Sequence, residues 1–140
     1  MKKIIQISEA TSLALHGMGI LVSSDTGRIT IKEMAEITQA SEAHLSKVFQ
    51  RLAKSGLVRS IRGPKGGFEL AKNPEEITLL DIYKAIEGEL TEDTCFLQNA
   101  TVCPFETCIF GDLVENLTQR FMEHLNKTTL HDLKGRSIKN

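Results

Sequence analysis

The chain has 140 residues, a formal net charge of −1, a hydrophobic share of 41% and three cysteines. This length suits one domain, or a small domain with an appended helical arm, and no apolar run is long enough to span a membrane. We therefore expect a soluble, cytoplasmic protein with no membrane partner. The charge is unevenly distributed, because residues 1–72 carry eleven Lys/Arg against six Asp/Glu and residues 73–140 carry six against twelve. A basic first half suggests that this part meets a polyanion.

The first two predicted helices are marked by their caps. Ser8 and Glu9 suit the cap and first turn of a helix whose apolar residues recur every three or four positions. A polar turn and a short predicted strand follow. Thr30 and Glu33 then have the spacing of a capping box, which predicts a second, shorter helix.

A third helix is predicted from its cap at Ser41 to Gly56. Its apolar positions form one stripe, namely Leu45, Val48, Phe49, Leu52 and Ala53. The opposite face is polar and basic, with His44, Ser46, Lys47, Gln50, Arg51 and Lys54. Two short helices joined by a tight turn predict a helix-turn-helix, whose second helix enters the DNA major groove. For the third helix alone, a solvated charged face is the alternative interpretation.

The following stretch favours DNA binding. Residues 57–62 have a strand pattern, residues 63–67 form a Gly-rich turn, and a returning strand begins at Phe68, which predicts the wing of a winged helix. From Lys47 to Lys65 there are six basic residues and no acidic one, as a phosphate backbone requires. A nucleotide-binding loop is disfavoured, because no Gly-Lys-Ser/Thr follows the turn. The predicted DNA-binding residues are Arg28, Ser41, His44, Ser46, Lys47, Gln50, Arg51, Arg59, Arg62, Lys65 and Gly66.

The second half of the chain predicts two further helices. Thr78 with Asp81 opens a helix that ends near Gly88. Pro104 suits the first position of a long helix of about five turns, which we expect to run from about Phe105 to residue 126. A small winged helix cannot cover the apolar stripe of that long helix, so a second copy of it is expected to do so in a two-fold homodimer.

The predicted fold is therefore mainly α with a small β-hairpin. A winged helix-turn-helix DNA-binding domain is expected at residues 1–77. The cysteine loop and a long C-terminal dimerisation helix are expected at residues 78–140.

All three cysteines lie close together, at positions 95, 103 and 108. Such a cluster in a chain without an export signal predicts thiolate ligands of a soft metal, either zinc or an iron–sulfur cluster. The alternative is three unrelated cysteines that behave as small buried hydrophobes. Zinc sites usually have short Cys-x₂₋₄-Cys pairs, whereas seven residues separate Cys95 from Cys103 here.

From about Ile7 to Leu133 the sequence resembles the IscR/NsrR-type winged-helix transcription regulators. The specific parts are the wing sequence at 57–68, the late three-cysteine loop and the Leu-Asn-Lys-Thr-Thr-Leu stretch at 125–130. The resemblance implies that Cys95, Cys103 and Cys108 hold an iron–sulfur cluster, with two or four irons. It also implies a dimer that binds double-stranded promoter DNA according to the state of the cluster.

The resemblance leaves the fourth ligand open. IscR-like members place a histidine three residues beyond the last cysteine, where this chain has Gly111. NsrR-like members use an acidic residue near the start of the first helix of the partner subunit, which makes Glu9 the candidate here. A carboxylate at a helix start also stabilises the helix dipole, which is the alternative role of Glu9. Other candidate ligands are Asp112, His124 and His131.

The sequence thus favours a dimeric transcription regulator that acts as a repressor. An iron–sulfur cluster would switch its DNA binding by sensing redox, nitric oxide or iron–sulfur status. One alternative keeps the fold with a structural zinc or with direct sensing by cysteines or a small molecule. A second alternative, an electron carrier or redox enzyme, leaves the basic helix and wing unexplained. No residue arrangement typical of an enzyme active site supports catalysis.

Overall fold

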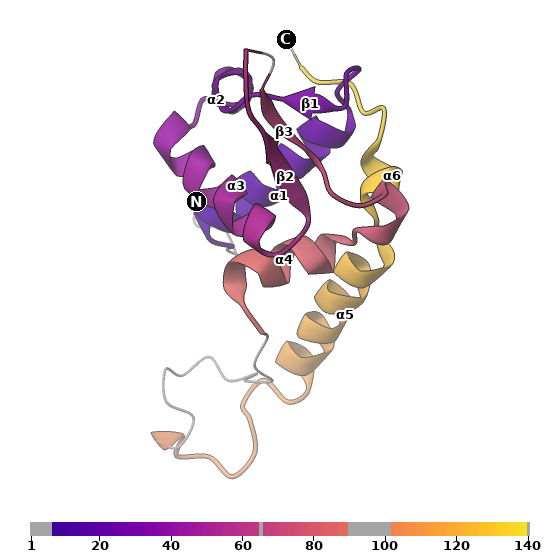
Figure 1. Ribbon diagram of the computed structural model, residues 1–140. Coiled ribbons are helices and arrows are strands. Elements are labelled where there is room, and N and C mark those ends of the chain that lie inside the picture. The colour runs from indigo at the N-terminus through magenta and orange to yellow at the C-terminus, as the bar shows by residue number, and fades with distance from the viewer. Residues whose placement is uncertain (1–6, 65, 90–101, 140) are drawn as a thin grey trace.

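The computed structural model describes residues 7–64, 66–89 and 102–139 (Figure 1). The fold is mainly α with a small sheet, as predicted. The elements, in chain order, are α1 (Glu9–Val22), β1 (Arg28–Ile29), α2 (Ile31–Thr38), α3 (Glu42–Lys54), β2 (Val58–Ile61), β3 (Gly67–Leu70), a 3-10 turn η1 (Pro74–Glu76), α4 (Leu79–Glu87), α5 (Leu113–Lys127) and α6 (Leu130–Leu133). None of the helices in the described ranges combines the length and hydropathy needed to cross a bilayer.

Four of the predicted helix starts are confirmed by their caps. The Ser8 and Ser41 hydroxyls each accept a backbone N–H from the first turn of α1 and α3. Thr30 and Thr78 form complete capping boxes with the carboxylates three residues later. These bonds satisfy backbone donors that no helical carbonyl reaches, which is why a local pattern predicts them.

The sheet has three antiparallel strands in the order β1-β3-β2, so the predicted hairpin gains β1 as a third strand. We call β2, β3 and the turn between them the wing. Backbone atoms pack closely at its turn: a Cβ on Gly66 would lie 2.5 Å from the Ile61 carbonyl oxygen, and one on Gly67 would lie 2.5 Å from that of Ile29. Only glycine fits at either position.

The core lies between α1, α3, α4 and the inner face of the sheet. Phe49 of α3 packs against Phe68 of β3 with ring centroids 5.2 Å apart and ring planes tilted by 57°. Residues on both sides of the predicted domain boundary at 77/78 share this core, because Ile77, Ile82 and Leu130 are as fully buried as Phe49.

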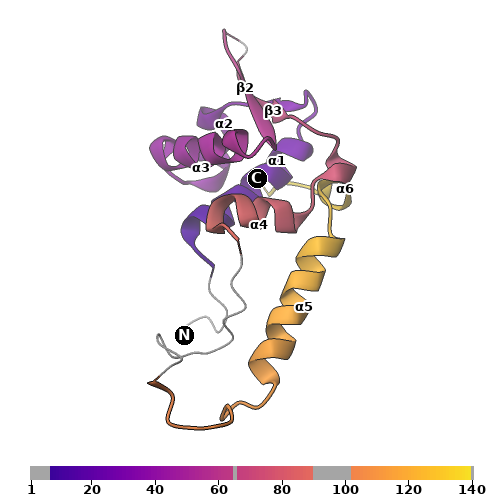
Figure 2. The ribbon, with the colours of Figure 1, turned by 60° about the horizontal axis from the view of Figure 1, so that its bottom comes forward.

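Helix α5 projects away from the winged helix (Figure 2). It begins at Leu113, so the prediction of a start near Phe105 with Pro104 in its first turn is wrong. The cause is local: Gly111 has a left-handed φ of +59°, and Asp112 caps the helix with non-helical angles. The helix consequently has 15 residues, about four turns rather than five.

A short helix, α6, follows α5 and was not predicted. Thr129 and Asp132 form its capping box, and Leu130 is fully buried in the core. The junction of α5 and α6 is held to the start of α4, because Leu79 N–H donates to the Thr128 carbonyl and Leu130 N–H donates to the Ile77 carbonyl, both at 2.9 Å. The 125–130 stretch therefore fastens the projecting helix to the core.

Candidate functional site

The outward face of α3 carries the predicted recognition residues. Lys47 and Gln50 are exposed, and the Gln50 amide donates to the Ser46 hydroxyl at 3.3 Å. The His44 ring is one-third exposed, with Nδ1 3.9 Å from a carboxylate oxygen of Glu9 at the start of α1. Polar donors and acceptors thus line one exposed helix face, which is what reading base edges in the major groove requires.

Arg51 differs from the other predicted α3 residues. Its guanidinium donates a hydrogen bond to the Ile86 carbonyl at the end of α4. The side chain therefore lies against α4 and satisfies one of the last carbonyls of that helix. A DNA contact by Arg51 stays a prediction, and it would require this bond to be exchanged for one with a phosphate.

The wing carries the second group of predicted DNA contacts. Arg62 is exposed at the end of β2, and Gly66 forms the turn, whereas Lys65 lies outside the described residues. Arg59 of β2 and Arg28 of β1 both contact the carboxylate of Glu69 on β3. Sequence reasoning did not identify Glu69, although counting back from the wing turn would have placed it opposite Arg59.

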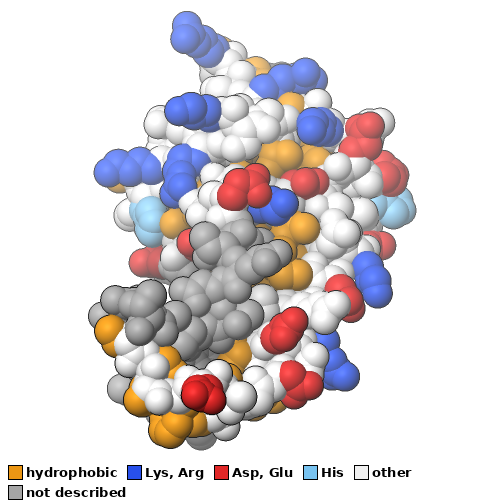
Figure 3. All heavy atoms as spheres, turned by 90° about the horizontal axis from the view of Figure 1, so that it is seen from below, with side chains coloured by type: hydrophobic (Ala, Val, Ile, Leu, Met, Phe, Trp, Pro, Cys, Tyr) orange, Lys and Arg blue, Asp and Glu red, His pale blue; other side chains and the backbone are white. Residues whose placement is uncertain are grey.

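Charged and apolar side chains separate on the surface. In Figure 3 the Lys and Arg side chains gather at the top and left, over the wing and α3. Hydrophobic side chains gather at the lower left, over the loop that leads into α5. The exposed large hydrophobic residues of this loop and of α5 are Val102, Phe105, Ile109, Phe110, Leu113 and Leu117.

The predicted metal ligands are only partly within the described residues. Cys95 lies outside them; Cys103 is half-buried and Cys108 is exposed, and both are free thiols. The Cys108 carbonyl accepts the Gly111 N–H at 2.9 Å, which turns the chain just before α5. Within residues 7–64, 66–89 and 102–139, no group of three or more His, Cys, Asp or Glu side chains is gathered for a metal.

The donor chemistry nevertheless fits an iron–sulfur cluster. Two unpaired thiols on one irregular, accessible loop are the soft ligands that iron and zinc prefer. Glu9 is exposed at the first position of α1, with its side chain 77% exposed. Its carboxylate lies next to His44 of α3, so any ligand role would draw it away from that ring.

A polar junction connects α1, α3 and α4. The Ser8 and Thr11 hydroxyls both donate to one oxygen of Glu87, at 2.6 Å and 2.5 Å. These two hydrogen bonds, helped by the nearby Arg51 charge, hold the pKa of Glu87 below its ordinary value of 4.5 although partial burial opposes them. Desolvation, and to a lesser extent the Glu87 charge, raises the pKa of Tyr83. Sequence reasoning did not identify this junction, because its members are distant in the chain.

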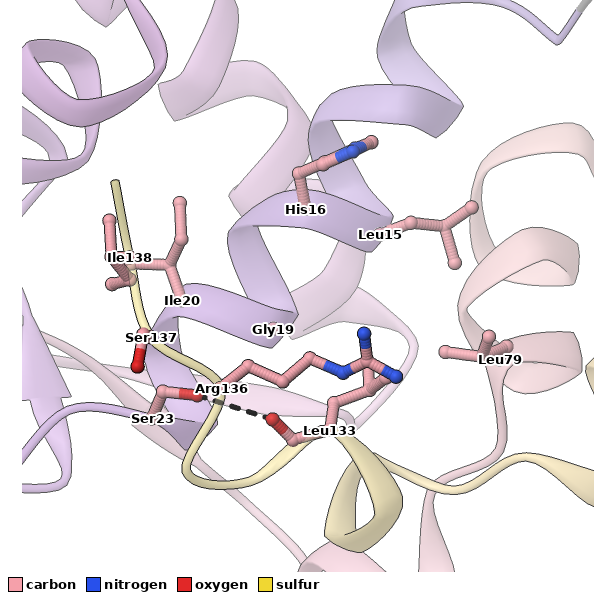
Figure 4. Close-up of a pocket in the computed structure, with 10 residues that line it drawn as sticks. All are labelled: Leu15, His16, Gly19, Ile20, Ser23, Leu79, Leu133, Arg136, Ser137 and Ile138. Atoms are coloured by element: carbon pink, nitrogen blue, oxygen red, sulfur yellow. Dashed lines mark hydrogen bonds between the residues drawn. The ribbon is translucent and has the colours of Figure 1, made fainter. Parts of the chain in front are cut away.

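One hollow lies away from all the predicted site residues. It has a volume of about 400 Å³ and is lined by α1, the start of α4 and the C-terminal segment (Figure 4). Leu15, Leu79 and Leu133 make its walls largely apolar, and the Arg136 side chain extends across it below Gly19. The Ser23 hydroxyl donates to the Leu133 carbonyl at 3.4 Å and so ties the C-terminal segment to α1.

Known proteins share this fold and much of the sequence pattern. The chain is 32% identical over 131 residues to the HTH-type transcriptional regulator NsrR of Shouchella clausii, covering 92% of this chain and 88% of that protein. It is 31% identical over 117 residues to the regulator IscR of Pectobacterium atrosepticum, covering 83% and 70%. Among solved structures, CymR, the global cysteine regulator of B. subtilis, matches with a TM-score of 0.71 and 30% identity, covering 93% and 96%.

The family follows from these similarities together with the winged helix. The model of the Rrf2 family, described as iron-dependent transcriptional regulators, matches residues 7–136, which is nearly the whole chain. The polar outer face of α3 and the basic wing agree with the DNA-binding function of such regulators. The protein therefore belongs to the Rrf2 family of winged-helix, DNA-binding transcriptional regulators.

Proposed function

We propose that this protein is a dimeric repressor whose DNA binding is switched by an iron–sulfur cluster. The observation that carries the proposal is the position of two free thiols, Cys103 and Cys108, on an accessible loop at the base of α5, at the opposite end of the molecule from the wing. Similarity to regulators named NsrR and IscR supports the assignment of these thiols to a cluster. The sensed signal would be redox, nitric oxide or iron–sulfur status.

The DNA interface consists of α3 and the wing. In this proposal α3 enters the major groove, and Ser46, Lys47 and Gln50 reach base edges and phosphates. Arg62 and the glycine-rich turn of the wing bind the neighbouring backbone. Support comes from the exposure of Lys47, Gln50 and Arg62 and from the absence of any acidic residue between Lys47 and Lys65. Because a dimer presents two copies of this surface, it would bind two half-sites about one helical turn apart.

A second copy of the chain would cover the apolar surface of α5 and its preceding loop. Phe105, Ile109 and Leu117 have exposed fractions of 58%, 70% and 50%. Complete burial of a fully exposed side chain of this size contributes roughly 1.5–3 kcal/mol, so each of these partly exposed side chains would contribute roughly half to two-thirds of that. A two-fold pairing would place the same surface on both subunits.

The cluster would be held by Cys95, Cys103, Cys108 and one ligand that is not a cysteine. When bound, such a cluster supplies an iron centre that reacts with oxidants or nitric oxide and that is lost when its ligands release it. Glu9 of the partner subunit is the proposed fourth ligand, because it stands exposed at the start of α1. The iron bound by that carboxylate would be the most weakly held.

A route from the cluster to the DNA-binding helix runs through the polar junction. Glu9 is the residue next to Ser8, whose hydroxyl bonds to Glu87, the last residue of α4. Arg51 of α3 bonds to the carbonyl of the neighbouring Ile86. Loss of a Glu9–iron bond would thus act on the start of α1, which is connected to α3 through the Ser8–Glu87 and Arg51–Ile86 hydrogen bonds. A coupling of about 1–3 kcal/mol between cluster and DNA would be ordinary.

The experiment compares DNA affinity with and without the cluster. The parent, Cys103→Ala and Glu9→Ala are reconstituted without air, and absorbance, iron and sulfide are measured. The probe is the duplex that the parent enriches from a random-sequence library. Glu123→Ala, which removes an exposed carboxylate on α5, is the matched control for Glu9→Ala.

We expect no stable cluster in Cys103→Ala, a more labile cluster in Glu9→Ala and a parent-like cluster in the control. The affinity of the parent for DNA should change when the cluster is removed. Equal affinity with and without the cluster would contradict the switch and leave DNA binding intact. Colourless protein that retains zinc would instead support a structural metal site.

A second candidate is direct sensing by the cysteines, and it is supported by the similarity to CymR of Staphylococcus aureus, whose structure has been solved in an oxidised form. Cys108 is exposed, so its thiol is open to oxidation without a metal. Under this alternative, metal-free protein would bind the same DNA differently when oxidised and when reduced, and Cys108→Ala would abolish the difference.

A further inference from the structure

The outer face of the sheet carries one carboxylate between two arginines. Glu69 lies on the central strand β3, and its register partners are Arg28 on β1 and Arg59 on β2. Residues paired across antiparallel strands point to the same face of the sheet. We propose that Glu69 is a positioning residue that holds Arg28 and Arg59 as a pair for the phosphates of the DNA backbone. The proposal rests on the proposed function and adds to it a residue that is itself repelled by DNA.

The two contacts use different oxygens of the same carboxylate. Arg59 Nε lies 2.6 Å from Glu69 Oε1, and Arg28 Nε lies 3.7 Å from Glu69 Oε2. A guanidinium has five N–H donors, and a contact through Nε leaves the terminal nitrogens to bind another anion. One carboxylate can therefore orient both arginines without consuming the atoms that bind phosphate.

The exposures place the carboxylate beneath the guanidinium groups. The Glu69 side chain is 25% exposed, whereas those of Arg28 and Arg59 are 47% and 65% exposed. An anion approaching this face would meet the guanidinium groups first. Glu69 therefore acts on DNA through the arginines rather than by touching it.

Arg28 is held beside the wing turn. It lines a hollow together with Pro64 and Gly66 of that turn. The Ser24 hydroxyl donates to the Arg28 carbonyl at 2.8 Å, which fixes the backbone at the same position. Arg28 therefore adjoins the wing turn predicted to bind the DNA backbone, and Glu69 connects it to Arg59 on β2.

Two opposing effects decide the result of removing the Glu69 charge. The carboxylate repels phosphates, but at physiological salt the Debye length is about 8 Å, and the screened repulsion changes affinity by less than about twofold. Ordering one long, rotamer-rich side chain in advance changes affinity by about two- to tenfold. With two arginines ordered, positioning outweighs repulsion. A simple surface ion pair would contribute little to either stability or binding.

The test uses the full-length protein and the duplex that the parent enriches from a random-sequence library. Glu69→Gln removes the charge and keeps the shape. We expect its dissociation constant to rise about fivefold at physiological salt, with an unchanged melting temperature. In an Arg28→Ala/Arg59→Ala background, adding Glu69→Gln should cause no further loss. Glu123→Gln, the same charge change on α5, should bind within about twofold of the parent.

Three outcomes are decisive. A Glu69→Gln variant that binds as tightly as the parent, or more tightly, would show that Glu69 acts only as a charge and would overturn the proposal. A loss of equal size in the background without the two arginines would also overturn it, because Glu69 would then act through the fold. A parent that enriches no duplex would refute the proposed function itself, which is a separate result.

Discussion

The winged helix and the segment at 102–127 differ in where their apolar side chains are covered. In the winged helix, Leu45, Phe49 and Leu52 are completely buried by other parts of the same chain. In the 102–127 segment, which we call the arm, Phe105, Ile109 and Leu117 are at least half exposed. The first region therefore buries its apolar side chains within one chain, whereas the second leaves large apolar side chains exposed, and we propose that a second copy of the chain covers them.

The largest effect is expected at Leu117 in the arm. Leu117→Glu places a charge in the middle of the apolar face of α5, and desolvating that charge on pairing is costly. We expect monomeric or aggregated protein in analytical ultracentrifugation at micromolar concentration, with the helical circular dichroism of the winged helix retained. Gln119→Glu adds the same charge to the same helix and should leave the dimer intact. A Leu117→Glu variant that sediments as a dimer would refute the role assigned to the arm.

The next largest effect is expected inside the winged helix. A Cβ on Gly17 of α1 would lie 2.8 Å from a ring carbon of Phe49 and 2.9 Å from the Met34 sulfur. We expect Gly17→Ala to destabilise the fold by about 1–3 kcal/mol through overpacking. Gly19→Ala is the matched control, because the nearest atom to its Cβ, in Leu133, is 3.8 Å away.

The control should raise stability by about 0.5–1 kcal/mol, since alanine favours a helix interior more than glycine does. Chemical denaturation of both variants measures the difference. Equal stability of the two variants would contradict the close packing of α1 on α3.

A smaller effect distinguishes the two arginines that were predicted together. Arg62 is exposed on the wing, whereas Arg51 bonds to the Ile86 carbonyl. Arg62→Ala should reduce the slope of log binding constant against log salt concentration by about 0.9, because one phosphate contact is lost. Its melting temperature should be unchanged. Arg51→Ala should lower the melting temperature because it leaves a helix-end carbonyl without its donor. If both variants change only the salt slope, Arg51 contacts DNA as the sequence alone predicts.

The smallest expected effect concerns acid stability at the polar junction. The Ser8 and Thr11 hydrogen bonds lower the pKa of Glu87, so the stabilisation is present above the ordinary carboxylate pKa and is lost as the pH falls through the lowered value. Glu87→Gln should therefore flatten the fall in unfolding free energy below about pH 4.5. Thr11→Val should do so in part, and Ser12→Ala on the same helix should not. If Glu87→Gln and the parent lose unfolding free energy equally as the pH falls, the polar junction does not contribute to acid-sensitive stability.

Local patterns predicted most of the secondary structure of the winged helix. Ser8, Thr30, Ser41 and Thr78 were recognised as caps, and each forms the expected bond in the structure. Such bonds join residues three positions apart, so their partners can be read directly from the chain. The start of α5 was missed because Pro104 was taken as the first position of the helix, whereas the left-handed Gly111 interrupts the chain before Leu113.

The candidate site was only partly predictable, because local patterns reveal only partners that are close together in the chain. The residue types, the basic run and the clustered cysteines are properties of composition and spacing, and the sequence by itself determined them. Tertiary structure decided that Arg51 bonds to α4, that Glu87 joins α1 to α4 and that Glu69 lies between Arg28 and Arg59. Arg59 and Glu69 are 10 positions apart in the chain, and Thr11 and Glu87 are 76 positions apart. Such pairs meet only after the sheet register and the helix packing have formed, because burial of the shared core, and not local hydrogen bonding, brings them together.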